Sequence, residues 1–282
     1  VQRVSLDGGF TCPNRDGTLS TEGCIYCNEI SFSPPYADKK LSIREQLSEG
    51  TRFLKSRFGA EKFIAYFQNR TNTYAPVTKL EKLYKEALDH KQVVGLAVST
   101  RPDCLNNDVL SLLSDISKQY DVNLELGIES LDPHSLEWMN RCHNRDTSLN
   151  ALEQAAHYGL DVTAHIILGL PTETREKVMR MPEELNELPL KFLKLHHLQV
   201  IRGTRLEKLY NEEKFKLFSY NEYLEFAAHF ISKLRSDMIL QRVISSSPDA
   251  YLVAPKWIQT TTAFIMDLQK YMRENDLYQG MK

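Results

Sequence analysis

Three cysteines near the start of the chain have the residue type and the spacing of a metal centre. Cys12 is followed by eleven other residues before Cys24, and two residues separate Cys24 from Cys27. The intervening segment is rich in turn-forming residues, so we expect a loop, which can bend its thiolates around one centre. Three thiolates suit an iron–sulfur cluster in which one iron is left open.

Zinc is the alternative metal, because thiolates bind zinc as well. A structural zinc site usually has four ligands. The other two cysteines, Cys104 and Cys142, are single and distant, and the nearest histidine downstream is His90. Tyr26 between the paired cysteines, and the position of the loop after a first strand, also favour iron–sulfur. We therefore set Cys104 and Cys142 aside as ligands.

Composition places the chain among ordinary soluble globular proteins. The 282 residues are 42% hydrophobic and 26% charged, with a formal net charge of -2. A global basic field for nucleic acid is absent, although net charge does not exclude a local basic patch. We expect neither a membrane span nor a signal peptide, hence a cytoplasmic protein. The sequence opens almost directly on the cysteine motif, so we expect residues to precede Val1.

Apolar runs that are rich in β-branched and aromatic residues predict parallel strands, most of them apolar on both faces. A short strand is expected within Val1–Phe10, and another within Met238–Ile244. The strands between them are expected at Lys62–Gln68, Val93–Ser99, Val122–Glu129, Asp161–Leu168 and Lys191–Val200.

Segments with helical periodicity fill the gaps between these strands. They are Leu41–Phe58, Val77–Asp89, Asp108–Gln119, a short one from Pro133 to Met139, Ser148–Tyr158, Thr174–Leu188, Asn221–Leu234 and Ile258–Arg273. The repeated β-α order predicts an α/β fold, a partial (β/α)6 TIM-like barrel. We expect the barrel over residues 1–203 and a C-terminal extension packed on it over 204–282.

The motifs resemble the radical SAM superfamily, in which three cysteines hold a [4Fe-4S] cluster and S-adenosylmethionine (SAM) binds the fourth iron. The long gap before Cys24 is similar to that of YhcC/YtqA-type members. The same resemblance is carried by GFTCPNRDG, GCIYCN, STRPDCL, ELGIES and AHIILGLPTET. A more distant similarity links the chain to the Elongator catalytic subunit and to oxygen-independent coproporphyrinogen oxidase.

The resemblance implies a SAM site at the carboxyl ends of the strands. It places Glu129 and Ser130 at the ribose hydroxyls, and Arg141 at the methionine carboxylate, which a guanidinium fork matches. Gly169 would allow close approach of the adenine, and His165 stands where coproporphyrinogen oxidases carry a ribose-binding aspartate. The remaining expected cofactor contacts are Tyr26, Gln68, Ser99 and Arg101.

Lys194 and His196 share one face of the sixth expected strand, so they are candidates for substrate contact or proton transfer. The resemblance implies that the enzyme, of an oxidoreductase or transferase type, makes a 5′-deoxyadenosyl radical that takes hydrogen from its substrate. It also implies an electron donor such as flavodoxin or ferredoxin.

The similarity to the Elongator domain suggests tRNA as the substrate, at the side chain of the wobble uridine. The resemblance to YtqA-type members implies that the carboxymethylaminomethyl group of this uridine is the part that is remodelled. A basic surface would then be expected, with candidates Lys39, Lys40, Arg44, Arg70, Arg202, Arg205 and Lys208. The alternatives are a radical SAM oxidoreductase that acts on a small metabolite, and a non-catalytic RNA-binding protein that is stapled by zinc.

Overall fold

The computed structural model describes residues 1–28, 33–213 and 215–281. The chain divides into two compact units. The first unit comprises Val1–Gly23, Phe32–Gly127 and Asn150–Thr163, and the second comprises Cys24–Ser31, Ile128–Leu149 and Ala164–Lys282. The boundary expected near residue 203 stays a prediction.

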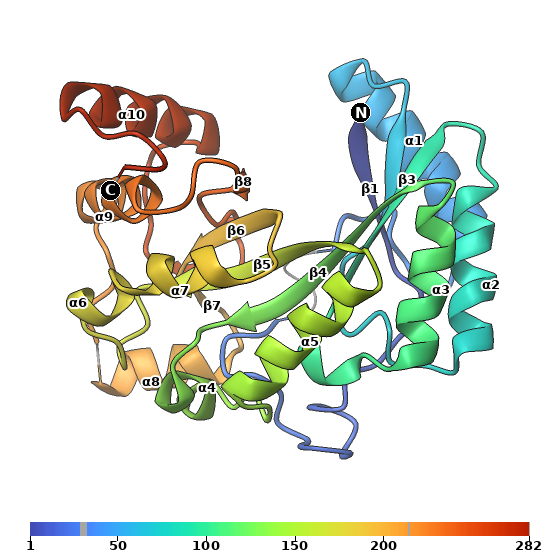
Figure 1. Cartoon of the computed structure of the whole chain (residues 1–282), viewed down its shortest axis with the longest axis horizontal. Helices are drawn as coiled ribbons and strands as arrows, with labels where there is room; N and C mark the ends of the chain where they lie inside the picture. The colour runs from blue at the N-terminus through green and yellow to red at the C-terminus, as the bar shows by residue number, and fades with distance from the viewer. Residues whose placement is uncertain (29–32, 214, 282) are drawn as a thin grey trace. The chain divides into compact units, whose positions relative to one another are not determined.

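Parallel strands form the centre of the first unit. These strands are β1 (Gln2–Leu6), β2 (Phe63–Phe67), β3 (Val93–Thr100) and the first part of β4 (Asp121–Glu129), each paired with the next. Helices α1 (Ile43–Phe58), α2 (Val77–Leu88) and α3 (Asn107–Ser117) connect them and lie on one side of these strands (Figure 1). A capping box at Ser42 begins α1, and Gly59, with a φ of 64°, ends it.

The second unit has two further sets of strands. Strand β6 (Phe192–His197) pairs in parallel with β8 (Ile239–Arg242), and β7 (Val200–Ile201) pairs antiparallel with β9 (Leu252–Ala254). Strand β5 (Asp161–Leu168) enters this unit at Ala164. The order of hydrogen-bonded strands in the larger sheet is β1-β2-β3-β4-β5-β6-β8.

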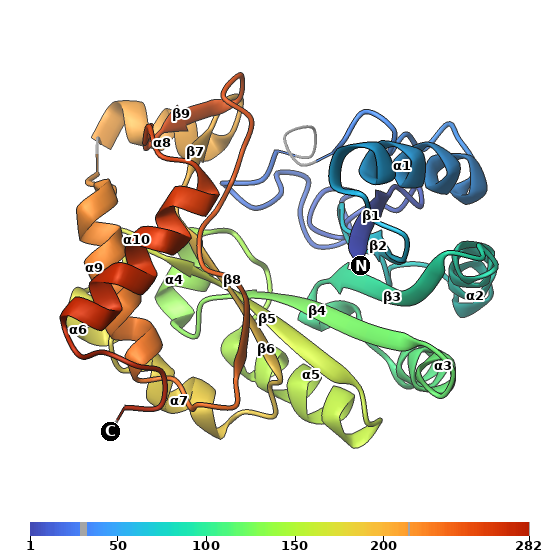
Figure 2. The ribbon, with the colours of Figure 1, turned by 90° about the horizontal axis from the view of Figure 1, so that it is seen from above.

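The helices of the second unit follow either a strand or another helix. They are α4 (Pro133–Trp138), α5 (Arg145–His157, which continues into the first unit), α6 (Arg175–Val178), α7 (Met181–Glu187), α8 (Arg205–Glu213), α9 (Tyr220–Ser232) and α10 (Thr261–Glu274). Helices α9 and α10 pack side by side (Figure 2).

The structure confirms the five internal strands and most of the helices, with two corrections. The single helix predicted over Thr174–Leu188 is wrong, because α6 ends at Val178 and α7 begins at Met181. Pro182 explains the break, since proline has no N–H and its ring would clash with the carbonyl of Val178 in a continuous helix. Strand β6 ends at His197 rather than at residue 200.

Glu125 is an exception to the expectation that most of the strands are apolar on both faces. Glu125 lies in the middle of β4 with its side chain fully buried, and Tyr66 and Ser99 bond to it from β2 and β3. Side chains on a strand alternate between two faces, so one face of these strands is polar. Long apolar stretches hid this alternation in the sequence.

Within the residues that the structure describes, we find no helix that is both long enough and apolar enough to cross a membrane.

Candidate functional site

A tight turn in the second unit presents two of the three cysteines. The backbone N–H of Cys27 donates to the carbonyl of Cys24 at 3.1 Å, which closes a turn with one thiol at each end. Cys24 is buried, Cys27 is half-buried, and neither is in a disulfide. This turn holds two thiols near each other without the help of a disulfide.

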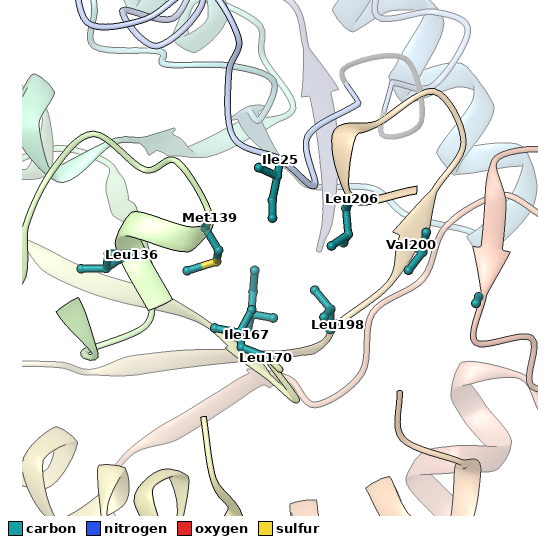
Figure 3. Close-up of a cluster of buried hydrophobic side chains, with 9 residues drawn as sticks. Ile25, Leu136, Met139, Ile167, Leu170, Leu198, Val200 and Leu206 are labelled. Carbon is teal, nitrogen blue, oxygen red and sulfur yellow. The ribbon is translucent and has the colours of Figure 1, made fainter. Parts of the chain in front are cut away.

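Ile25 anchors this turn in an apolar cluster (Figure 3). Its side chain is 1% exposed and belongs to a buried group that also contains Leu136, Met139, Ile167, Leu170, Leu198, Val200, Leu206 and Ala254. The N–H of Ile25 donates to the Met139 carbonyl at 3.1 Å, and the Ile25 carbonyl accepts from the N–H of Leu206 at 2.9 Å. The N–H, the carbonyl and the side chain of Ile25, which lies between the two cysteines, are therefore all held in place.

Arg141 approaches the turn from the segment that follows α4. One nitrogen of its buried guanidinium donates to the Cys24 sulfur at 3.3 Å and to the Tyr26 hydroxyl at 3.3 Å. Burial raises the pKa of Tyr26 well above its usual value, against the opposing charge of Arg141, so this phenol stays a neutral hydrogen-bonding group. Arg141 thus sets a cation beside a sulfur that would have to bind metal as a thiolate.

Glu129 ends β4 in a strained conformation. Its φ of 68° lies in the left-handed region, which costs a non-glycine residue energy and is often found where function requires it. The carboxylate charge acts on both Tyr26 and Arg141, so it lies near them. The second unit therefore brings together five of the residues predicted from the sequence, which are Cys24, Tyr26, Cys27, Glu129 and Arg141.

The third cysteine, Cys12, lies in the first unit. Its carbonyl accepts from the N–H groups of Arg15 at 2.8 Å and Asp16 at 3.0 Å, so a turn follows it. Cys104 lies close enough for the charge of Cys12 to affect it. Burial chiefly, with the nearby charge of Asp103, raises the pKa of Cys104 to about 12. Cys104 is therefore a protonated thiol at neutral pH, consistent with setting it aside as a ligand.

Three of the expected cofactor contacts bond to protein groups within the first unit: Ser99 to Glu125, Gln68 to Ser5 and Arg101 to Asp103. The Gln68 side-chain carbonyl accepts from the Ser5 hydroxyl at 3.1 Å. Arg101 is 4% exposed, and its guanidinium donates to both carboxylate oxygens of Asp103, at 2.8 and 2.9 Å. Their roles at a cofactor stay predictions.

A buried polar network around Glu125 was missed in the sequence. The carboxylate accepts from the Tyr66 hydroxyl at 2.6 Å and from the Ser99 hydroxyl at 3.2 Å, and it forms an ion pair with Arg3. Burial chiefly, and then the negative charge of Glu125, raise the pKa of Tyr66 far above its usual value. The sequence signal that could have found this network is the lone carboxylate of Glu125 within an apolar strand, because a carboxylate charge is buried only when it is paired.

Ser130 bonds to Glu173, a residue that lines a pocket of the second unit. Its hydroxyl donates to Glu173 and accepts from the N–H of Asp132 at 2.9 Å. Burial raises the pKa of the Glu173 carboxyl, against the hydrogen bond from Ser130. The pocket has a volume of about 230 Å³ and is lined by Leu131, Asp132, Pro133, Arg145, Glu173, Lys177, Val178, Met181 and Glu184. Ser130 thereby links the turn after β4 to the loop after β5.

The last four predicted residues lie on β5, β6 and the exit from β5. The ring of His165 lies 5.4 Å from that of His196, which shares β6 with Lys194. Gly169 has a φ of 90°, and a Cβ there would come within 2.8 Å of the Phe218 ring. Glycine is therefore required at this position by the backbone and by Phe218.

The chemistry of the donors fits an iron–sulfur cluster. Cys12, Cys24 and Cys27 are not in disulfides, and each lies at a turn of the backbone. The Arg141 guanidinium donates to the Cys24 sulfur. Among the described residues, no three His, Cys, Asp or Glu side chains gather closely enough to hold a single metal ion.

Two family models match the chain. The model of the radical SAM superfamily matches residues 14–185, and that of the radical SAM C-terminal domain matches residues 190–274. Cys24 and Cys27 lie inside the first match, and Cys12 lies two residues before it. Together the matches account for most of the chain.

Similar proteins include YhcC of Escherichia coli K12, at 33% identity over 98% of this chain and 88% of its own length. YtqA of Bacillus subtilis is 29% identical over 99% of this chain and 87% of its length. A tRNA uridine(34) acetyltransferase of Methanocaldococcus jannaschii is 25% identical over 65% of this chain but only 30% of its own length.

Solved structures share the fold. Archaeal Elp3 of Methanocaldococcus infernus, with an N-terminal deletion, matches 99% of this chain with a TM-score of 0.76 at 18% identity, and this chain covers 64% of it. SuiB of Streptococcus suis bound to S-adenosylmethionine matches 87% of this chain with a TM-score of 0.57 at 11% identity, and this chain covers 50% of it. These matches confirm the predicted α/β, partial TIM-like barrel fold.

Proposed function

This chain belongs to the radical SAM superfamily, a family of enzymes, and we propose that it cleaves S-adenosylmethionine with a [4Fe-4S] cluster held by Cys12, Cys24 and Cys27. The observation that carries the proposal is the anchored turn at Cys24–Cys27 with Arg141 bonded to it. Such a cluster, when bound, supplies the electron that converts SAM into methionine and a 5′-deoxyadenosyl radical, which abstracts hydrogen from the substrate.

The chain's own residues then bind and orient the SAM. The Arg141 guanidinium is a planar fork that matches the methionine carboxylate, and it lies next to the cysteine turn. The Glu129 carboxylate accepts the hydrogen bonds of the two ribose hydroxyls. Tyr26 keeps its proton while its hydroxyl accepts from the Arg141 guanidinium, so it adds no negative charge beside the thiolates.

Cluster binding is tested by anaerobic reconstitution. Wild-type protein should become brown, contain four irons and four sulfides as the cluster formula requires, and release 5′-deoxyadenosine from SAM on reduction. Cys12→Ala, Cys24→Ala and Cys27→Ala should each lose these properties. Cys142→Ser is the matched control, because Cys142 is exposed and set aside as a ligand. Bound zinc without iron would instead favour the zinc-stapled alternative.

We infer that the substrate is tRNA, at the carboxymethylaminomethyl side chain of the wobble uridine. The support is the similarity to a tRNA uridine(34) acetyltransferase and the fold shared with archaeal Elp3. On this proposal the protein acts in the cytoplasm with flavodoxin or ferredoxin as the electron donor.

The substrate is tested by mass spectrometry of tRNA nucleosides from cells with and without the gene. The proposal expects the uridine derivative at the wobble position to change on deletion and to recover on complementation. Unchanged uridine modifications, together with no retention of tRNA by purified protein at low salt, would favour a small metabolite instead.

A further inference from the structure

Four basic side chains lie together on strands of the second unit. Lys194 and His196 alternate on β6 and so share one of its faces. Arg242 of β8 is the register partner of Lys194, and partners in parallel strands point to the same side. The ring of His165, on β5, lies 5.4 Å from the ring of His196. We call these four residues the basic group.

The centre of the basic group is withdrawn from water. Lys194 is 4% exposed. The Nδ1 of His196 lies 3.4 Å from the Ser245 hydroxyl, whereas its Nε2 is buried with no hydrogen-bond partner among the described residues. Burial, and then the charges of His165, Arg242 and Lys194, hold the pKa of His196 well below its usual value. His196 is therefore neutral. Its Nδ1 faces the Ser245 hydroxyl, and its Nε2 makes no hydrogen bond to the described residues.

This arrangement has the chemistry of an anion site. Positive groups held close together repel each other, and a bound anion relieves that repulsion. An ammonium, a guanidinium and an imidazole N–H are all donors, and a planar carboxylate accepts such donors on both of its oxygens.

We propose that the basic group binds a carboxylate of the substrate. This inference rests on the proposed function, because the carboxymethylaminomethyl side chain of the uridine ends in a carboxylate. Lys194 is almost fully shielded from solvent, so the basic group suits a narrow side chain that projects from a base better than a backbone phosphate, which is held at the surface of the nucleic acid. The basic group then sets which uridine derivative is accepted.

The test is a binding titration that needs no turnover. The full chain is titrated with 5-carboxymethylaminomethyluridine, with the same nucleoside as its primary amide, and with inorganic phosphate. The NMR signal of the His196 ring, assigned with His196→Gln, is followed in each titration. We expect the carboxylate to shift this signal and to bind roughly 10- to 100-fold more tightly than the amide, as expected for charge-assisted hydrogen bonds.

Charge-removing variants sharpen the test. Lys194→Gln and Arg242→Gln should each reduce the preference for the carboxylate over the amide at least roughly tenfold. Arg242 is exposed, so its variant is informative even if Lys194→Gln fails to fold. Lys270→Gln removes the same charge from an exposed part of α10 and should leave the preference as it is.

Three outcomes would overturn the inference. Equal binding of amide and carboxylate would do so, as would an unchanged preference in both charge-removing variants. A His196 shift with phosphate but not with the carboxylate would mean a phosphate site. If deletion of the gene changes wobble uridine while the carboxylate preference is absent, only this inference fails. If the tRNA is unchanged on deletion, the proposed function itself fails.

Discussion

Truncation of Ile25 should loosen the cysteine turn, because the Ile25 side chain is buried in the apolar cluster of the second unit, against which Tyr26 of the same turn also packs. Ile25→Ala removes three carbon atoms from a side chain that is 1% exposed. At about 0.8 kcal/mol for each buried carbon, the transfer loss is about 2.4 kcal/mol. Incomplete collapse of the cavity raises the expected cost to roughly 2–5 kcal/mol.

Two measurements separate the stability of the fold from cluster binding. Urea unfolding of the cluster-free protein gives the free energy of unfolding, which we expect to fall by roughly 2–5 kcal/mol in Ile25→Ala and by about 1 kcal/mol in Ile25→Val. Iron that remains after a chelator challenge of the reconstituted protein should decrease in the same order. We expect this decrease because the turn would then be held chiefly by the backbone bonds to Met139 and Leu206 and by the packing of Tyr26.

The matched control is Leu19→Ala. Leu19 is a large apolar residue between Cys12 and Cys24, but its side chain is 47% exposed, so its truncation should change neither quantity. If Ile25→Ala costs less than about 1 kcal/mol and keeps as much iron as Leu19→Ala, then the apolar cluster does not position the cysteines and our reasoning is wrong.

Three further predictions concern single groups. Arg141→Lys keeps the charge but loses the fork, so calorimetric affinity for SAM should fall roughly 10- to 100-fold. Cys104, with its pKa near 12, should resist iodoacetamide at pH 8 while exposed Cys142 reacts, as followed by peptide mass spectrometry. Burial lowers the pKa of His197 to about 3 from the usual 6.5, so the folded state binds this proton less tightly than the unfolded state does. The contribution to stability is therefore complete above pH 6.5 and is lost toward pH 3, by up to about 1.4 kcal/mol per pH unit. His197→Phe should flatten the dependence of urea unfolding on pH over that range.

Each of these has a result that would count against it. SAM affinity that is unaltered in Arg141→Lys would mean that the guanidinium acts only on the Cys24 sulfur. Alkylation of Cys104 as fast as that of Cys142 would show that its environment is open to solvent. An unfolding profile that depends on pH equally in wild type and His197→Phe would assign the acid sensitivity to other groups.

Local patterns predicted most of the fold. The apolar runs located β2 to β6 because strands in a parallel sheet need buried side chains wherever they lie along the chain. The same runs concealed Glu125, whose burial depends on Arg3, Tyr66 and Ser99, and these partners are remote in the sequence. The prediction of one helix over α6 and α7 is wrong because the apolar periodicity continues through Pro182, whereas a helical backbone breaks at a proline.

The type and number of the cysteines favoured an iron–sulfur cluster over zinc, and the resemblance of the motifs to the radical SAM superfamily implied the class of chemistry. Only the tertiary structure decided how that motif is supported. Ile25 packs in its apolar cluster, and Arg141 donates to the Cys24 sulfur, through contacts between segments more than a hundred residues apart. The basic group likewise exists only because β5, β6 and β8 lie close together, and strand alignment is a property of the sheet and not of any one strand.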